Sequence, residues 1–243
     1  MNDLTTSCKH VPAQRHAEAW TFLIEAVRDI RTTGAIAPSS RRLARSLVEP
    51  LREQAGRRLT VLEAGAGTGA VTRALIPLLS TGSHLDIVEA NAVFAGRLCR
   101  LVRAHPLLAD CPERVRVHHT PVEELVTDRR YDVIVSGLPF TNFAPGQVET
   151  IMCRYRELLR PGGVLTYFAY LGSGPLRALA ASRAEVRRHR AVQAVLARQR
   201  GRYTTGCRTV WGNLPPARVW RLRAHAAEPA VCDSCPDTVG TAQ

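Results

Sequence analysis

The sequence of 243 residues contains a single lysine, Lys9, although 33 of its residues are lysine or arginine. Arginine therefore supplies almost all of the positive charge, and the formal net charge is +12. An arginine-rich genome places arginines on solvated faces without any functional reason. The net charge by itself therefore identifies no partner.

Long apolar runs are missing too, because no stretch approaches the ~20 residues that a helix needs to span a bilayer. Residues 1–7 show no basic segment leading into an apolar core, so no secretory signal is visible. We therefore expect a cytoplasmic protein that is either free in solution or peripheral at the inner face of the cell membrane.

The seven cysteines have no regular spacing, which favours a reducing compartment over a disulfide framework. Cys232 and Cys235 form a single Cys-x-x-Cys pair, and no second pair follows at the spacing of a zinc site. Cys8 and His10 are too far from that pair in the sequence to complete it. The sequence therefore predicts no metal.

Acidic residues are nearly absent between Leu171 and His225. This segment contains twelve arginines and one acidic residue, Glu185. Guanidinium groups bind phosphate well, so this segment favours contact with phosphate, either in anionic lipid headgroups or in nucleic acid. The alternative is an arginine-rich surface with no ligand. The sequence gives no indication of the oligomeric state.

The most informative stretch is 59–70. Leu59–Ala64 is a short apolar run with β-branched members, which predicts a buried strand. Gly65, Gly67 and Gly69 follow and allow a sharp turn that a ligand can approach closely. Val71–Leu79 predicts a helix whose last turn is weakened by Pro77. Strand, glycine turn and helix together build a nucleotide crevice in an open α/β sheet.

Two acidic residues favour S-adenosylmethionine over a dinucleotide in that crevice. Glu63, at the end of the strand, would repel a pyrophosphate but attract the methionyl ammonium. Glu89 closes the next strand, about 20 residues beyond the last glycine, where it can accept both ribose hydroxyls. Glu89 suits either cofactor, whereas Glu63 suits only S-adenosylmethionine.

The rest of the chain predicts a doubly wound α/β fold with a mainly parallel seven-stranded sheet and an N-terminal helical extension. We expect a disordered leader (1–13), the helical extension (14–55), the cofactor-binding domain (56–225) and a disordered tail (226–243). The expected helices are 14–31, one capped by Ser39 or Ser40 and running to Leu51, 92–104, 148–159 and 175–200. The later strands are 85–89, 114–119, 131–136 and 164–170, with a terminal hairpin of 209–213 and 218–223.

The turns after the third and fourth strands should complete the crevice. Thr120, Pro121 and Val122 follow the third strand, and we expect them beside the adenine. Ser136 and Gly137 follow the fourth strand, and we expect them near the sulfonium.

The methyl acceptor should meet the loop 136–143. Methyl transfer from a sulfonium is a direct displacement, in which positioning does much of the work. Pro139 stiffens this loop, so the carbonyls of Gly137 and Leu138 can accept hydrogen bonds from an amine. Phe140, with Phe143, can cover a methylated nitrogen at ~0.5–2 kcal/mol per cation–π contact. We take Gly137, Leu138, Pro139 and Phe140 as the candidate catalytic residues, and His118 or His119 as a candidate general base.

These residues carry a resemblance. Glu63-Ala64-Gly65-Ala66-Gly67-Thr68-Gly69, Glu89 and the segment from Ser136 to Phe143 resemble the bacterial phospholipid N-methyltransferases, as do the flanks 34–41 and 213–220. The resemblance covers about residues 18–224. It implies a Rossmann-like class I methyltransferase fold and methylation of phosphatidylethanolamine. It also implies that the basic surface, with Trp20 of the first helix, meets an anionic membrane.

Two other acceptors remain open. The ribosomal RNA adenine dimethyltransferases carry an asparagine where this sequence has Gly137, and this chain has no room for their C-terminal helical domain. A small-molecule N- or O-methyltransferase of specialised metabolism is the other possibility, because the acceptor can change while the cofactor loops persist.

Overall fold

The computed structural model describes residues 38–171, 183–213 and 216–224. The predicted leader (1–13), the amphipathic helix (14–31) and the tail (226–243) lie outside the described residues. Cys8, Cys232 and Cys235 also lie outside them.

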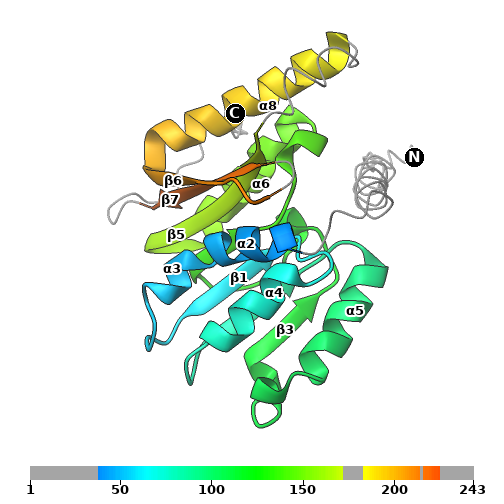
Figure 1. The fold of residues 1–243 in the computed structure, drawn as a ribbon, viewed down its shortest axis with the longest axis vertical. Coiled ribbons are helices and arrows are strands. Elements are labelled where there is room, and N and C mark those ends of the chain that lie inside the picture. The colour runs from blue at the N-terminus through cyan, green and yellow to red at the C-terminus, as the bar shows by residue number, and fades with distance from the viewer. Residues whose placement is uncertain (1–37, 172–182, 214–215, 225–243) are drawn as a thin grey trace, which may run out of the picture.

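Seven strands form one sheet in the order β3-β2-β1-β4-β5-β7-β6 (Figure 1). The strands are β1 Thr60–Ala64, β2 His84–Val88, β3 Val115–His118, β4 Tyr131–Ser136, β5 Leu159–Tyr170, β6 Thr204–Val210 and β7 Ala217–Arg223. The first five are parallel, and only β7 runs antiparallel to its neighbours β5 and β6. The predicted mainly parallel, seven-stranded doubly wound sheet is confirmed.

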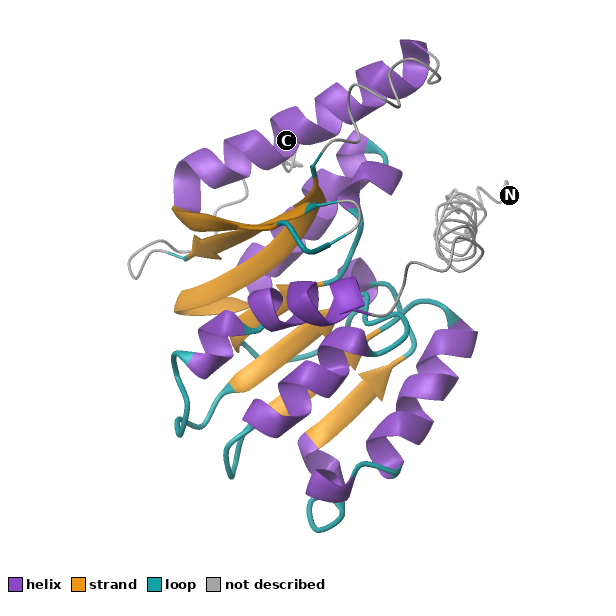
Figure 2. Cartoon of the chain, viewed as in Figure 1, coloured by secondary structure: helices purple, strands orange, loops and turns teal. Residues whose placement is uncertain are grey.

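Helices cover both faces of this sheet (Figure 2). One face is covered by α2 Pro38–Leu47, α3 Glu49–Arg52, α4 Ala70–Leu75 and α5 Ala92–Arg103, and the other by α6 Pro145–Leu158 and α8 Arg183–Tyr203. Val61 packs into the first layer and its neighbour Leu62 into the second, and both are fully buried. A strand buried on both faces reads as a continuous apolar run, which explains the pattern of residues 59–64.

The helix after the glycine loop is present but divided. The helix α4 ends at Leu75, and a 3₁₀ turn, Ile76–Leu78, replaces the rest of the predicted segment. Pro77 lies in that turn, where its missing N–H and its ring prevent a regular α-helical turn. The weakening expected at Pro77 is therefore confirmed.

The start of the described chain differs from the prediction. The helix α2 begins at Pro38, so Ser39 and Ser40 lie inside its first turn, and the prediction that one of them caps the helix is wrong. Proline suits the first helical position because its N–H would be unpaired there in any case. The helix also stops at Leu47, and α3 begins again with Pro50 in its first turn.

The end of the described chain differs as well. The helix α8 continues to Tyr203, three residues beyond the predicted end. The strand β6 follows it directly and begins at Thr204, earlier than the predicted Thr209. The predicted hairpin is confirmed, with Thr209 opposite Arg218. Within 38–171, 183–213 and 216–224, none of the helices combines the length and the apolar character needed to cross a membrane.

Candidate active site

The carboxyl ends of β1, β2, β3 and β4 meet at one edge of the sheet, where ligands bind in open α/β folds. The loops after these strands line a pocket at that edge. Gly65 follows β1, Ala90 follows β2, and Leu138 follows β4. The crevice predicted from the glycine turn therefore exists.

The glycine loop depends on left-handed backbone at Gly65 (φ 72°), Gly67 (φ 54°) and Gly69 (φ 80°). A Cβ atom on Gly65 would collide with the side chain of Leu138. Both the left-handed backbone and this contact therefore favour glycine at position 65. A Cβ atom on Gly67 would meet nothing within 4 Å. The loop is thus packed at Gly65 and open at Gly67, where a ligand can reach the backbone.

Glu63 lies at the bottom of this loop and is fully buried. Its Oε2 accepts a hydrogen bond of 2.7 Å from the Thr72 hydroxyl on α4. Its Oε1 is also buried and has no hydrogen-bond partner among the described residues. Burial raises the pKa of Glu63 to about 8. The Thr72 hydrogen bond lowers this pKa, and the charge of Glu89 raises it further. A buried acceptor of this kind suits an ammonium ligand.

Glu89 links β2 to the glycine loop. Its carboxylate accepts hydrogen bonds of 2.8 Å from the backbone N–H groups of Gly67 and Asn91. Desolvation by burial raises the pKa of Glu89, although these backbone hydrogen bonds and the charge of His119 oppose the shift. Each carboxylate oxygen can accept more than one hydrogen bond, so Glu89 can still receive ribose hydroxyls.

The turn after β3 reaches the same edge of the sheet. Thr120, Pro121 and Val122 line the same pocket as Gly65. Glu123 of the same turn lines it too, as does Ile151, which sequence reasoning missed. Ile151 lies in the middle of α6 and looks like any core residue of a helix, so no local signal could have identified it.

The loop after β4 is held against the glycine loop. The Gly137 N–H donates a hydrogen bond of 2.8 Å to the Ala64 carbonyl. Ser136 is fully buried, and its hydroxyl accepts a hydrogen bond of 3.0 Å from Tyr155 of α6. The Ser136 side chain therefore supports the loop from below, and Leu138 and Phe143 are the residues of this loop that line the pocket.

The two phenylalanines of this loop differ in position. Phe140 is 2% exposed, and its ring packs edge to face on Tyr167 with the centroids 5.6 Å apart. Phe143 is also buried but lines the pocket together with Leu138. Phe140 is thus a core residue here, in contrast to the predicted contact with a methylated nitrogen, and the geometry favours Phe143 for that contact.

The carbonyls of Gly137 and Leu138 accept no hydrogen bond in the described part of the chain. Pro139 follows them and leads into a short 3₁₀ turn, Phe140–Asn142, in which the Pro139 carbonyl is already used by Asn142. The two carbonyls that the sequence predicted as acceptors for an amine are therefore still available.

The two histidines lie in different surroundings. His118 Nε2 lies 2.9 Å from Asp86 Oδ1, and the Tyr131 hydroxyl donates to the other oxygen of Asp86 at 2.9 Å. His118 therefore belongs to a structural cluster around a buried carboxylate. His119 is less engaged, with its Nε2 3.1 Å from the Ala90 carbonyl at the edge of the crevice. Of the two candidate bases, only His119 lies beside the site.

The site fits S-adenosylmethionine. Glu63 has a buried oxygen free for the methionyl ammonium, Gly67 offers open backbone, and Glu89 lies at the end of the next strand. No group of three or more His, Cys, Asp or Glu side chains in the described residues has the arrangement of a metal site.

Known proteins share this domain and fold. The family described as "Methyltransferase domain" matches residues 61–163. A polyketide synthase–nonribosomal peptide synthetase of Aspergillus flavipes is 30% identical over 109 residues, which are 44% of this chain but 3% of that protein.

Two solved structures show how far the fold extends. One is the 1,6-didemethyltoxoflavin-N1-methyltransferase of Burkholderia thailandensis, bound to S-adenosylhomocysteine. It has a TM-score of 0.59 and 20% identity, covering 90% of this chain and 93% of that one. The other is the N-methyltransferase NodS of Bradyrhizobium japonicum, also with S-adenosylhomocysteine. It has a TM-score of 0.57 and 17% identity, covering 78% of this chain and 89% of that one.

Residues 61–163 therefore match a methyltransferase domain, and the chain shares the Rossmann-like fold of these solved methyltransferases. The predicted fold and enzyme class are confirmed. The S-adenosylhomocysteine bound in both neighbours agrees with the predicted cofactor. The phospholipid acceptor implied by the resemblance is a finer statement than these comparisons reach.

Proposed function

We propose that the whole chain acts as an S-adenosylmethionine-dependent N-methyltransferase whose acceptor is the amine of phosphatidylethanolamine or a related phospholipid. The observation that carries this proposal is the loop after β4. It brings two unused carbonyls, of Gly137 and Leu138, to the edge of the sheet beside the glycine loop. When bound, S-adenosylmethionine supplies an electrophilic methyl group on its sulfonium.

The chemistry of the loop suits an amine. Backbone carbonyls accept hydrogen bonds from an ammonium and can orient its nitrogen without covalent chemistry. An ammonium must lose a proton before it can be methylated, because it has no lone pair. His119, at the edge of the crevice, is the residue that we assign to that proton, directly or through water. A quaternary product donates no hydrogen bond, and Phe143 offers an aromatic surface for it.

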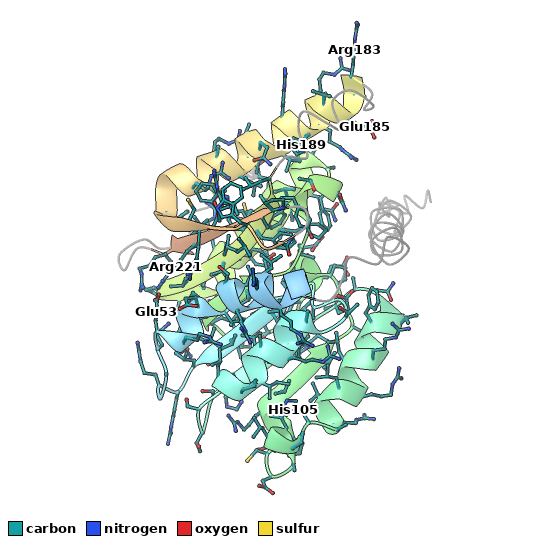
Figure 3. The ribbon with its side chains drawn as sticks, viewed as in Figure 1. Glu53, His105, Arg183, Glu185, His189 and Arg221 are labelled. Atoms are coloured by element: carbon teal, nitrogen blue, oxygen red, sulfur yellow. The ribbon has the colours of Figure 1, made fainter. Side chains whose placement is uncertain are left out.

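The arginines of α8 support a phospholipid over a neutral acceptor. Arg183, Arg187, Arg188 and Arg190 are all exposed, and Glu185 is the only acidic residue of the helix. Figure 3 shows Arg183 at the end of α8 that lies furthest from the sheet. A row of exposed guanidinium groups attracts anionic lipid headgroups. We therefore propose a peripheral position at the inner, cytoplasmic face of the cell membrane.

The test is methyl transfer from radiolabelled S-adenosylmethionine to three acceptor pools: ethanolamine phospholipid vesicles, ribosomal RNA and a total small-metabolite extract. We expect label in the lipid, with one, two and three methyl groups appearing in sequence. Label only in a small metabolite would replace the lipid by the second candidate, a small-molecule N- or O-methyltransferase. Label only in RNA would favour the third, an adenine N6-methyltransferase.

The second candidate has its own support. The pocket is lined mainly by small and apolar residues such as Gly65, Ala90 and Leu138, which would also suit a compact acceptor. Both solved N-methyltransferases share the fold, and a shared fold leaves the acceptor open.

A further inference from the structure

Two arginines lie against one tryptophan on the α8 face of the sheet. The guanidinium carbon of Arg200, from α8, is 4.4 Å from the centroid of the Trp220 ring. That of Arg218, two residues before Trp220 on β7, is 5.6 Å from the same centroid. Both distances are within the range of a cation–π contact. Trp220 therefore holds two positive charges close together.

This cluster lies near the loop that receives the acceptor. Ser136 of β4 is in register with Tyr167 of β5, and Tyr167 with Trp220 of β7. Trp220 is thus two strands from Ser136, about 10 Å across the sheet. Arg218 pairs with Ala169, two residues further toward the carboxyl end of β5. It is therefore displaced toward the same edge as the β4 loop.

Side chains connect the cluster to that loop. Arg200 donates a hydrogen bond of 3.3 Å to the Tyr167 hydroxyl, and Phe140 packs on the Tyr167 ring. The series Phe140, Tyr167, Arg200 and Trp220 therefore runs without a break from the β4 loop to the arginines. A ligand bound at the arginines would be held at a defined position relative to Gly137.

Arg218 lacks a counterion. In the described residues it forms no ion pair, and its Nε is buried without a hydrogen-bond partner. Other arginines with nearby carboxylates use them, for instance Arg221 with Glu53, which lie together in Figure 3, and Arg198 with Glu149. A part-buried guanidinium with an unused N–H, next to a second guanidinium, is stabilised by an anion.

We propose that Arg218, with Arg200 beside it, forms an anion subsite that binds the phosphate of the methyl acceptor. The inference rests on the proposed function and names the part of the acceptor that the fold recognises. A guanidinium can bind two phosphate oxygens at once, and the aromatic ring keeps it oriented. Phosphate bound here would direct the attached amine toward the carbonyls of Gly137 and Leu138.

The experiment measures binding of phosphate-bearing probes in the presence of saturating S-adenosylhomocysteine. The probes are O-phosphoethanolamine, short-chain phosphatidylethanolamine and, for comparison, ethanolamine without phosphate. We expect wild type to bind at least one phosphate probe about tenfold or more tightly than ethanolamine. The monoester and the diester separate a free phosphate from a lipid headgroup as the natural source.

Arg218→Gln should lose that tenfold advantage, and Arg218→Lys should keep part of it because the charge remains. Arg208→Gln is the matched control. It removes an exposed arginine from the neighbouring strand, at a position whose side chain alternates to the other face. Titration with S-adenosylhomocysteine shows that each variant is folded.

Equal binding of phosphate probes by wild type and Arg218→Gln would overturn the subsite. So would an equal loss in Arg208→Gln, which would indicate a general effect of charge. Labelled methyl transfer tests the proposed function separately. If wild type methylates an amine and Arg218→Gln methylates it equally well, the subsite is refuted and the proposed function stands. Arg218-dependent phosphate binding without transfer to any amine would refute the function alone.

Discussion

A methyl group on Gly137 would lie 2.5 Å from the carbonyl oxygen of Gly65. These two glycines directly follow different strands, β1 and β4, and they bring the cofactor loop and the acceptor loop into backbone contact. The Gly137 N–H to Ala64 carbonyl hydrogen bond of 2.8 Å lies at the same place. The separation between the two loops therefore depends on the absence of a side chain at position 137.

Gly137→Ala should weaken both folding and cofactor binding. The added methyl meets backbone, which cannot move without breaking the contact, and overpacking of this kind costs about 1–3 kcal/mol. Gly146→Ala is the control, because its Cβ would meet nothing within 4 Å in the first turn of α6. We expect the melting temperature to fall by several degrees for Gly137→Ala and to stay unchanged or rise for Gly146→Ala. Equal melting temperatures would contradict the close contact.

Binding of S-adenosylhomocysteine should release a proton from Glu63. Burial raises the pKa of Glu63 to about 8, so the carboxyl is largely protonated at pH 7 in the free protein. A ligand ammonium beside it favours the charged form. Calorimetry at pH 7 in two buffers of different ionisation enthalpy should therefore detect release in wild type and none in Glu63→Gln.

Glu89→Gln serves as the control here, because it should reduce affinity without removing the proton release due to Glu63. The folding equilibrium gives a second check on the same group. The native state holds a proton that the unfolded state loses above pH 4.5, so this contribution to stability declines as the pH rises from 4.5 to about 8. Glu63→Gln should flatten that decline, and an unchanged pH profile would rule out the shift.

Affinity for S-adenosylhomocysteine should fall about 10- to 100-fold in Glu89→Gln. The amide replaces one charged acceptor by a donor, and hydrogen bonds to charged groups contribute about 1.5–3 kcal/mol. The Gly67 N–H would also lose its 2.8 Å partner if the amide nitrogen faced it. Glu157→Gln, at a surface residue that pairs with Arg154, should leave the affinity unchanged. Similar affinities for Glu89→Gln and wild type would mean that the ribose contact is misassigned.

Tyr155 and Ser136 should be coupled in stability. The Tyr155 hydroxyl is buried and donates to Ser136 at 3.0 Å, so Tyr155→Phe should cost about 1–2 kcal/mol. A double-mutant cycle with Ser136→Ala should give a coupling of at least about 0.5 kcal/mol. Tyr170→Phe is the comparison, since the Tyr170 hydroxyl forms no hydrogen bond among the described residues while its ring packs on Phe168. Additive changes in the free energy of unfolding for the two single substitutions would show that this hydrogen bond contributes no stability.

Recruitment to anionic vesicles should depend on the exposed arginines of α8. Neutralising Arg187, Arg188 and Arg190 together removes about 1 kcal/mol per charge, or roughly 100-fold in partitioning. The control removes three exposed arginines elsewhere, Arg52, Arg57 and Arg58. Co-sedimentation with vesicles at rising salt measures both, and binding should weaken as salt screens the charges. Equal losses in the two triple variants would exclude α8 as the contact.

Most of the fold could be predicted because its signals are local. The apolar run of β1, the glycines after it and the break at Pro77 all act within a few residues. The errors lie at element ends, as at Ser39 and Thr204, because one more helical turn there changes the free energy of folding only a little. Asp86 shows the limit of local signals. Its partners His118 and Tyr131 come from other strands, and no spacing in the sequence brings them together.

The sequence by itself was enough to predict the cofactor crevice, because Glu63, the three glycines and Glu89 lie at the ends of consecutive strands, whose order along the chain places them at one edge. Only the tertiary structure decided what surrounds the acceptor. Packing against Tyr167 places the Phe140 ring in the core and leaves Phe143 at the pocket, and strand register displaces Arg218 toward the same edge of the sheet as the β4 loop. Such contacts join residues far apart in the chain, and their geometry depends on how the layers fit together.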